Sequence, residues 1–533
     1  MMLPRLNPIG PKKSVQVQFR GLEHTIGATD GALWAMRNLC SDHFPVLSTR
    51  RKRRVVQTLE DPGGVYCHER LMLVDGTTLY YDGQAVGQVR AGRKRFAALG
   101  DVIVILPDKL CFDTQTGELT PMERSWSGAA LSFGAGTIYG EEAAANTITA
   151  AGVDWAEFFR AGDAVTIAGC VAHPENNKTA IIREIDGEEL RFSENCFVLD
   201  GEGGDEDYTE TGTLTVERTV PDLAFVCEYE NRLWGCDERT VYACKLGDPY
   251  NWNVFDGVDT DSYAVDTGST GPFTGCVSFL GHPVFFKEEH IYKVYGSRPS
   301  NFELVQSAET GVKEGSGDSL AVAGNVLYYL SPAGWAAYTG GIPQLIGDAF
   351  GADRFVSAVG GTDGIKYYAS AVDGSGARRL VVYDPRVRAW HEEDDAAAVG
   401  FARRGAEAWM LTEDGALWAV GAEGDGDEEP DFAWFCEFAD FTANSPNKKF
   451  VSKIQLRLEL DAGASAKAML RFDSTGGWIQ AGQITNRGRK SSFYLPIIPR
   501  RADHFRLRLE GVGGCRVYSL ALDLAGGSEL QLH

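Results

Sequence analysis

The stretch ALGDVIVILPDKLCFDTQTG, residues 98–117, joins an apolar strand to a second apolar strand through a tight turn. The same pattern returns six more times along the chain, often with Tyr or Trp in the second strand. The further copies begin at His68, Tyr229, Phe279, Ala323, Thr362 and Arg404. A β-meander of this kind cannot bury both of its faces alone, whereas radial stacking of such units buries them. The repeat therefore predicts an all-β chain built around a β-propeller.

The spacing of the later copies predicts the number of blades. Their turn residues lie 50, 43, 40 and 41 residues apart, at Asn231, Gly281, Gly324, Gly364 and Gly405. Blades of four short strands repeat about every 40 to 50 residues. Two copies before residue 123 and five after residue 220 predict about seven blades, with six or eight as alternatives.

Changes in composition and in the pattern of apolar residues divide the chain into five parts. Residues 1–60 are predicted to form an extended N-terminal arm with one short helical candidate at 32–39, and residues 61–122 the first propeller blades. In residues 123–220, short alternating strands between Gly and Asn turns predict an inserted small β-barrel domain. Residues 221–425 hold the remaining blades. The strict alternation in residues 426–533 predicts a C-terminal β-sandwich, as in KIQLRLEL at 453–460.

Composition narrows the class of protein. The 533 residues carry a net charge of −23, which argues against a protein that wraps nucleic acid. No run of about 18 apolar residues occurs, so we expect no membrane-spanning segment. The N-terminus has no apolar signal-peptide stretch, which predicts a protein made in the cytosol. The eleven cysteines are odd in number and form no CxxC pair, which predicts buried reduced thiols without structural zinc.

Positive charge is concentrated in one run of five residues, whereas acidic residues collect at 202–210 and 425–431. An exposed run of like charges repels itself unless an acidic partner is near. We therefore predict that the run contacts an acidic surface of a neighbouring subunit, with a solvated loop as the alternative. The predicted interface residues are Arg50, Arg51, Lys52, Arg53 and Arg54.

Catalytic motifs are absent from the sequence, which has no GxSxG, GxxxxGK or HExxH and no GxGxxG after a strand. We therefore expect no enzyme activity, no catalytic residue, no cofactor and no metal site. Two acidic loops leave calcium open as an alternative to solvated loops, although the first lacks the Gly and Glu of an EF-hand. They are Asp256 to Asp266, and Asp425 with Asp427, Glu428 and Glu429. His282 and His290 are expected to be ordinary turn and strand residues.

Two further patterns touch on carbohydrate. The stretch RFDSTGGWIQAG from Arg471 has the Asp473 and Trp478 of a sialidase Asp-box, but its Gly and Thr are misplaced and it lies outside the blades. Four tryptophans fall within blade strands, where we expect core packing, with glycan stacking as the alternative. They are Trp335, Trp390, Trp409 and Trp418.

Several stretches resemble structural proteins of tailed bacteriophages. Residues 21–54, GLEHTIGATDGALWAMRNLCSDHFPVLSTRRKRR, resemble the opening of tail nozzle proteins (tail tubular protein B type) and related prophage tail proteins. The insertion, GDAVTIAG with NNKTAIIREIDGEELRF, is similar to a small β-domain of phage head–tail components. The first match falls on Asp30, Gly31, Asn38, Leu39, Pro45, Leu47 and Arg50. A blade element matches at Asn231-Arg232-Leu233, Gly247-Asp248-Pro249 and Asn251-Trp252.

The resemblance implies a structural subunit of a phage tail, in a hexameric nozzle or hub ring around the DNA exit channel. It implies copies of the chain and neighbouring tail or connector proteins as partners, DNA that passes without specific binding, and a place in the virion tail after synthesis in the host cytoplasm. A strongly acidic chain suits such a channel because negative walls repel phosphate. The alternatives are a carbohydrate-binding or carbohydrate-cleaving propeller that acts as a tail receptor-binding component, and a cytosolic propeller scaffold.

Overall fold

The computed structural model describes residues 12–25, 32–137, 144–193, 195–202, 204, 206–420, 426–442, 448–485, 488–495 and 497–526. Within these ranges the regular structure is β-strand and short 3₁₀ helix, without an α-helix. No helix in this part of the chain is long and apolar enough to cross a membrane. The chain divides into two compact units, residues 1–69 with 313–533 and residues 70–312.

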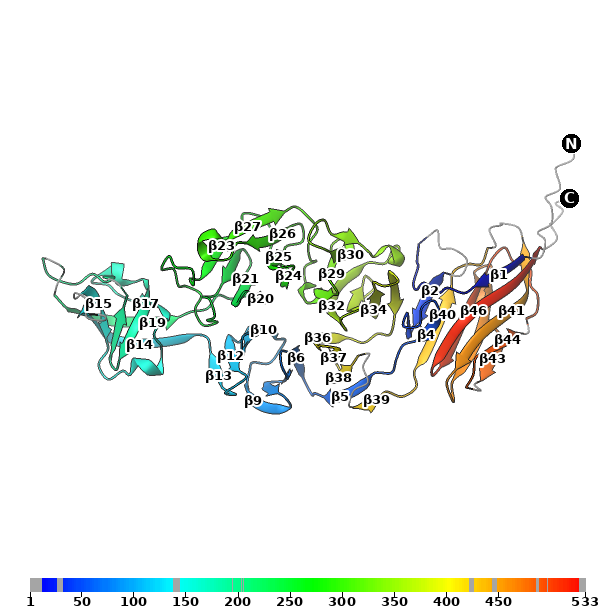
Figure 1. Cartoon of the computed structure of the whole chain (residues 1–533), viewed down its shortest axis with the longest axis horizontal. Coiled ribbons are helices and arrows are strands. Elements are labelled where there is room, and N and C mark those ends of the chain that lie inside the picture. The colour runs from blue at the N-terminus through cyan, green and yellow to red at the C-terminus, as the bar shows by residue number, and fades with distance from the viewer. Residues whose placement is uncertain are drawn as a thin grey trace, which may run out of the picture. The chain divides into compact units, whose positions relative to one another are not determined.

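Antiparallel meanders dominate the first half of the chain (Figure 1). Four of them are four-stranded sheets whose strands pair in chain order. Their strands are β6 (Pro62–Cys67), β7 (Leu71–Asp75), β8 (Thr78–Tyr81) and β9 (Gln84–Gln88); β10 (Arg95–Leu99), β11 (Val102–Leu106), β12 (Leu110–Asp113) and β13 (Leu119–Pro121); β20 (Phe225–Tyr229), β21 (Arg232–Cys236), β22 (Thr240–Ala243) and β23 (Tyr263–Asp266); β24 (Gly275–Phe279), β25 (His282–Phe286), β26 (Ile291–Tyr295) and β27 (Glu303–Ser307).

Three further sheets of the same kind follow, and the last of them takes in a strand from the N-terminal region. Together the seven sheets are the blades of a β-propeller, as the repeat predicted. The strands are β28 (Ala321–Ala323), β29 (Val326–Ser331), β30 (Gly334–Tyr338) and β31 (Gln344–Leu345); β32 (Phe355–Thr362), β33 (Tyr367–Asp373), β34 (Arg378–Asp384) and β35 (Ala389–Glu392); β36 (Ala398–Arg404), β37 (Glu407–Thr412), β38 (Ala416–Ala419), β5 (Arg54–Thr58) and β39 (Asp427–Glu428).

The turn residues that set the repeat spacing all have a positive φ. Asn231 and Gly281, for example, have φ of 58° and 74° in the tight hairpins β20–β21 and β24–β25. Two-residue hairpins with this geometry match the twist of their strands, and Gly and Asn adopt it at the lowest cost. These residues therefore place each blade's first turn.

The insertion is a closed six-stranded barrel, in the order β14-β15-β18-β17-β16-β19. Its first and last strands pair with each other, Arg124 opposite Arg218, so the chain leaves and re-enters the neighbouring blades at one place. The interior is filled by apolar side chains such as Phe133, Ile148 and Trp155. The strands are β14 (Arg124–Gly136), β15 (Ala144–Thr149), β16 (Ala164–Ala168), β17 (Thr179–Asp186), β18 (Glu189–Phe192) and β19 (Tyr208–Arg218).

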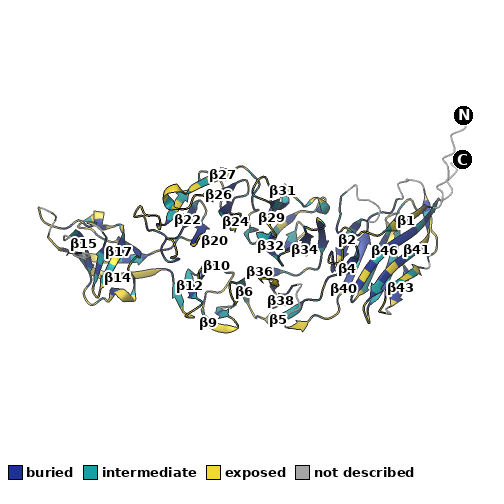
Figure 2. Ribbon diagram, in the orientation of Figure 1, coloured by how far each residue is buried: buried dark blue, intermediate teal, exposed yellow. Residues whose placement is uncertain are grey.

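The C-terminal region is a two-sheet sandwich, as predicted. One sheet has the order β3-β4-β46-β41-β44 with β1 also on β46, and the other β2-β40-β45-β42-β43. Buried and exposed residues alternate along β41 (Figure 2), where Ile454, Leu456 and Leu458 face the core. The strands are β1 (Lys12–Gln16), β2 (Leu33–Arg37), β3 (Leu39–Cys40), β4 (Leu47–Thr49), β40 (Ala433–Phe438), β41 (Lys449–Leu460), β42 (Ser465–Phe472), β43 (Thr475–Thr485), β44 (Ser491–Leu495), β45 (Phe505–Val512) and β46 (Cys515–Gly526).

The N-terminal region differs from the extended arm expected for residues 1–60. Its described part supplies β1–β4 to the sandwich and β5 to the last blade, so in Figure 1 blue strands lie beside orange and red ones. The helical candidate at 32–39 is strand β2, with Leu33 opposite Phe438. The reason is burial, because Leu33 and Met36 are 0% and 1% exposed in the sandwich core.

Candidate functional site

Of the predicted interface residues, Arg50 to Arg53 lie between β4 and β5 and Arg54 begins β5; two of the five are buried inside their own chain. The side chains of Arg50 and Arg53 are 5% and 6% exposed. Arg53 donates to Glu393 Oε2 at 2.6 Å and to Asp394 Oδ2 at 2.7 Å. Arg50 donates through Nη2 to Glu429 Oε2 at 3.1 Å and pairs with it a second time through Nη1. We call these five residues the buried ion-pair cluster.

In the buried ion-pair cluster two arginines face three carboxylates, and the opposite charges stabilise one another. Burial opposes the charge of Arg53, but the carboxylates of Asp394 and Glu393 outweigh burial and raise the pKa of Arg53. Burial likewise opposes the charge of Asp394, but Arg53 and Arg50 outweigh it and lower the pKa of Asp394. Arg53 and Asp394 are therefore each held charged by their neighbours, and removing one leaves an uncompensated buried charge.

The other three cations of the run also find acidic partners in the same chain. Lys52 Nζ lies 2.8 Å from Asp431 Oδ1, and Arg54 Nη2 lies 3.8 Å from Glu428 Oε1. Arg51, 64% exposed, pairs with Asp42. The acidic partner that the run requires is thus largely the second acidic stretch, of which residues 426–431 are described. Contact with a neighbouring subunit stays a prediction, and the self-repulsion on which it was based is already relieved within the chain.

A cavity of about 310 Å³ adjoins the buried ion-pair cluster and is lined in part by Cys40, Asp42 and Lys366. Lys366 is 7% exposed and forms an ion pair with Asp42. Burial raises the pKa of Cys40 to about 11. Because the thiolate is the reactive form of cysteine, Cys40 is not an activated nucleophile at neutral pH.

A second buried polar cluster joins the barrel to the blade β20–β23. Asp163, 0% exposed, pairs with Arg218 at the end of β19 and accepts a hydrogen bond from Asn251 Nδ2 at 3.0 Å. Asn251 Oδ1 accepts a hydrogen bond from the amide of Ala164 at 2.9 Å. Arg160 and Asp248 form an ion pair at 2.6 Å at the edge of the cluster. We call this set the barrel clamp.

The barrel clamp includes residues of the blade element that resembles phage tail proteins, the segment with Gly247-Asp248-Pro249 and Asn251-Trp252. Asp248 and Asn251 belong to it directly, and Trp252 is 1% exposed and donates through Nε1 to the carbonyl of Pro249 at 2.9 Å. The motif therefore folds into a tight local turn that presents Asp248 and Asn251 to the barrel. Sequence reasoning missed Asp163, Arg160 and Arg218, because no local pattern links them to partners that lie 55 to 88 positions away.

The first stretch of the resemblance has a similar place in the fold. Asn38 has φ 57°, its amide donates to the carbonyl of Glu393 at 2.6 Å, and its Nδ2 donates to the carbonyl of Ala433 at 2.8 Å. It also accepts from Arg50 Nε at 2.8 Å. Asn38 thereby ties the last blades to the sandwich. Leu39 and Leu47 are buried, whereas Asp30 and Gly31 lie outside the described residues.

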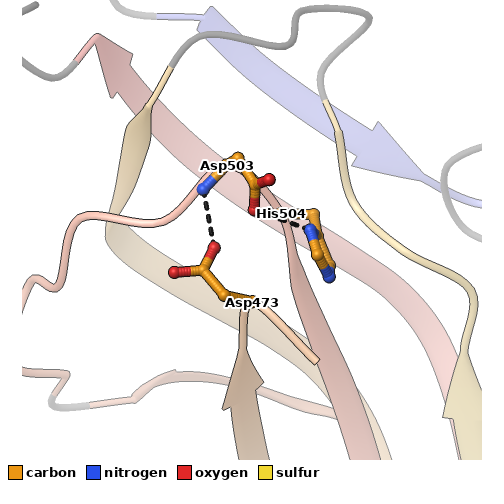
Figure 3. Close-up of side chains that lie close together, drawn as sticks. All are labelled: Asp473, Asp503 and His504. Carbon is orange, nitrogen blue, oxygen red and sulfur yellow. Dashed lines mark hydrogen bonds and ion pairs between the residues drawn. The ribbon is translucent and has the colours of Figure 1, made fainter. Parts of the chain in front are cut away.

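Asp473 lies in a cluster that the sequence did not predict (Figure 3). Its Oδ1 accepts from the amide of Asp503 at 2.8 Å, and His504 Nδ1 lies 2.7 Å from Asp503 Oδ1. A side-chain hydrogen bond with Asp473 and the adjacent His504 lower the pKa of Asp503. Among the described residues, these three are the only group whose candidate metal-ligand atoms all lie within 4.8 Å of one another. Each already has a partner in the chain, Ser474 completing the set on His504 Nε2.

The other predicted acidic loop does not converge on one point. Asp256 pairs with Arg183, Asp259 with Arg298, and Asp266 accepts from Thr240. Asp261, 3% exposed, accepts from two amides of its own loop. The loop is held by separate partners, which leaves the calcium alternative without a common coordination point in it.

The structure also places the tryptophan, histidine and cysteine residues that the sequence analysis considered. Trp335 and Trp390 are each 1% exposed, which confirms the core interpretation for both, whereas Trp409 and Trp418 are half-buried. His282 Nδ1 lies 3.1 Å from the carbonyl of Val294. The cysteines are free thiols.

No protein-family model matches this chain, and no curated protein matches it. Similar solved structures include the computationally designed Ika8 protein, with TM-score 0.33, 9% identity and coverage of 69% of this chain and 99% of that one. BamB from Moraxella catarrhalis has TM-score 0.32, 9% identity and coverage of 71% and 98%. An exo-β-1,3-galactanase from Phanerochaete chrysosporium has TM-score 0.22, 8% identity and coverage of 56% and 94%.

One expectation is corrected by these comparisons. We expected a chain without enzyme activity, and this is contradicted by the presence of an exo-β-1,3-galactanase, an enzyme, among the similar structures. The correction has a general reason, since one fold hosts many unrelated functions and function resides in sites carried on the fold. At 8% identity the likeness concerns the fold alone and assigns no reaction to this chain.

Proposed function

We propose that this chain is a structural subunit of a bacteriophage tail. In this proposal several copies, about six by the resemblance, form a closed nozzle or hub ring around the DNA exit channel. The ring binds neighbouring tail or connector proteins, and DNA passes through it without specific binding. The subunit is made in the host cytoplasm and is incorporated into the virion tail.

The observation that carries the proposal is the place of the motif residues. Asn38 and Arg50, from the first stretch of the resemblance, lie where the sandwich meets the last blades. Asp248 and Asn251, from the blade element of the resemblance, lie where the barrel meets a blade. Buried, fully paired polar networks fix a single arrangement of the elements that they join. The residues that carry the resemblance therefore join structural modules of the chain, which supports a structural role.

Charge supports the same proposal. With a net charge of −23, the chain presents a mostly negative surface to a polyanion. A channel lined by such subunits repels phosphate and lets duplex DNA move without adhering. The prediction is that purified protein does not bind duplex DNA at 150 mM salt.

The test is native mass measurement of the purified full-length chain, together with binding assays on duplex DNA and on a glycan array. A closed oligomer without affinity for DNA or glycans supports the proposal. A monomer that binds a defined glycan contradicts it and favours the carbohydrate-binding alternative. Hydrolysis of that glycan would extend the alternative to a carbohydrate-cleaving enzyme.

A further inference from the structure

Two modules of this chain carry opposite net charges. Residues 448–526, in the sandwich, contain 14 Lys and Arg against 6 Asp and Glu, a net charge of +8. Residues 124–218, which are the barrel, contain 6 Lys and Arg against 18 Asp and Glu, a net charge of −12. Since the whole chain carries −23, the sandwich is a basic exception in an acidic protein. Such segregation favours contact between unlike modules of different molecules.

Part of the positive charge of the sandwich lies on the outer face of the sheet that contains β41, whereas Lys467, Arg471, Arg506 and Arg508 lie on the other sheet. Ile454, Leu456 and Leu458 point into the core, so Lys453, Gln455 and Arg457 point outward. Cross-strand register carries this face onto the neighbouring strands, because Gln455 lies opposite Tyr494 on β44 and Ala521 on β46. Lys453 and Arg457 are exposed.

Aromatic rings hold part of this charge in place. Lys453 Nζ lies 4.0 Å from the ring centre of Tyr494, and Lys490 Nζ lies 3.6 Å from that of Tyr518. Tyr494 is itself 57% exposed. Cations on aromatic faces lose less freedom on docking than free side chains do, and exposed tyrosine is favoured at protein contacts. We define the basic face as Lys453, Arg457, Lys490, Tyr494 and Tyr518.

Two carboxylates lie near the basic face: Asp523 is opposite Lys453 in the β41–β46 register, and Glu459 accepts a hydrogen bond from Tyr518 and pairs with Arg516. Within the described part of the chain, Lys453, Arg457 and Lys490 form no ion pair with a carboxylate. By contrast, all five cations of the run at 50–54 have acidic partners in their own chain. The positive charge still available to a partner therefore lies on the sandwich rather than in the run.

The complementary surface is one end of the barrel. The β17–β18 turn packs on the 3₁₀ helix η1 (Trp155–Glu157), since the amide of Trp155 donates to the carbonyl of Gly187 at 3.1 Å. This brings together six carboxylates, of which Asp186 is 70% exposed, and Arg191 pairs with three of them. We define the acidic end as Asp154, Glu157, Glu184, Asp186, Glu188 and Glu189.

We propose that the basic face of one copy docks on the acidic end of the barrel of a second copy, head to tail. The inference deepens the proposed ring and rests on it for closure. A contact between two different surfaces of identical subunits generates a ring if the rotation closes and a filament if it does not. One exposed ion pair stabilises a contact only slightly, so several must act together, and they set partner choice and association rate.

The test uses two charge-reversed variants of the full chain. The sandwich variant is Lys453→Glu, Arg457→Glu, Lys490→Glu, and the barrel variant is Glu157→Lys, Asp186→Lys, Glu188→Lys. Each variant is expected to be monomeric at a concentration where the natural chain assembles. An equimolar mixture is expected to assemble to the natural size from alternating variants, because each unchanged basic face meets an unchanged acidic end and each reversed face meets a reversed end. A chain that carries both sets is expected to assemble again.

The control variant reverses three exposed cations of the propeller blades, Arg70→Glu, Arg298→Glu and Arg378→Glu, and changes the net charge as much as the sandwich variant does. It should assemble like the natural chain. Thermal denaturation of all variants confirms folding.

Several outcomes overturn the inference, and they are separable from failure of the proposed ring. Assembly of either single variant to the natural size, or a mixture that stays monomeric, overturns the docking while a natural ring leaves the proposed function intact. Open filaments that both variants abolish support the docking and contradict the ring. A natural chain that stays monomeric at every concentration and salt contradicts both.

Discussion

Replacing Arg53 by Met tests whether the basic run stabilises its own chain through buried ion pairs. Arg53 is 6% exposed and bridges Glu393 and Asp394, so the substitution leaves two carboxylates buried without their main partner. Breaking a buried ion pair from one side costs about 3 to 5 kcal/mol. The matched control is Arg54→Met in the same run, whose side chain is 36% exposed and lies 3.8 Å from Glu428. Loss of an exposed pair costs about 0 to 1 kcal/mol.

The assay is urea denaturation at pH 7, followed by tryptophan fluorescence. Trp390 and Trp434 are buried in the core that the N-terminal strands share, so they report unfolding of this unit. The deficit of Arg53→Met should persist in 1 M salt, because buried pairs are screened far less than exposed ones. Equal losses for the two variants, or a deficit of Arg53→Met that salt removes, would refute the reasoning.

Three further predictions concern pH, the barrel clamp and a close backbone approach. Burial lowers the pKa of His391 from 6.5 to about 4, so its contribution is complete above pH 6.5 and is lost as the pH falls toward 4; His391→Gln should flatten that part of a stability profile measured by urea denaturation. Asn251→Ala should speed hydrogen exchange at the amide of Ala164, which loses its acceptor, whereas replacing the half-buried Asn253 by Ala should not; equal exchange in both would count against the clamp. Gly415→Ala places a Cβ 2.0 Å from the carbonyl oxygen of Leu59 at φ +88° and should cost on the order of 1 to 3 kcal/mol in thermal unfolding, more than Gly405→Ala, whose Cβ meets nothing within 4 Å.

Local sequence patterns predicted most of the fold. The hairpin turns of the blades are marked by residues such as Asn231 and Gly281, which adopt a positive φ readily, and this preference is visible in one sequence. The alternation of Ile454, Leu456 and Leu458 likewise depends only on the pleat of one strand. Elements set by nearest neighbours were therefore predictable.

Long-range partners were not predictable. Strand β5 begins at Arg54, the last residue of the basic run, and nothing in its own residues shows that it pairs with β38 more than 350 positions away. The same holds for Arg50 and Glu429, 379 residues apart, and for Asp473 and Asp503, which meet only when β42 and β45 pair. A run of like charges is predicted to be exposed when only the sequence is known, because the residues that neutralise it lie far away along the chain.

The measurement that tests the central claim most directly is electron microscopy of the purified full-length protein at physiological salt. The account predicts closed rings of about six copies around a central channel, seen end-on as one class of particle. Isolated single-copy particles at micromolar concentration, with no rings at any salt, would contradict it.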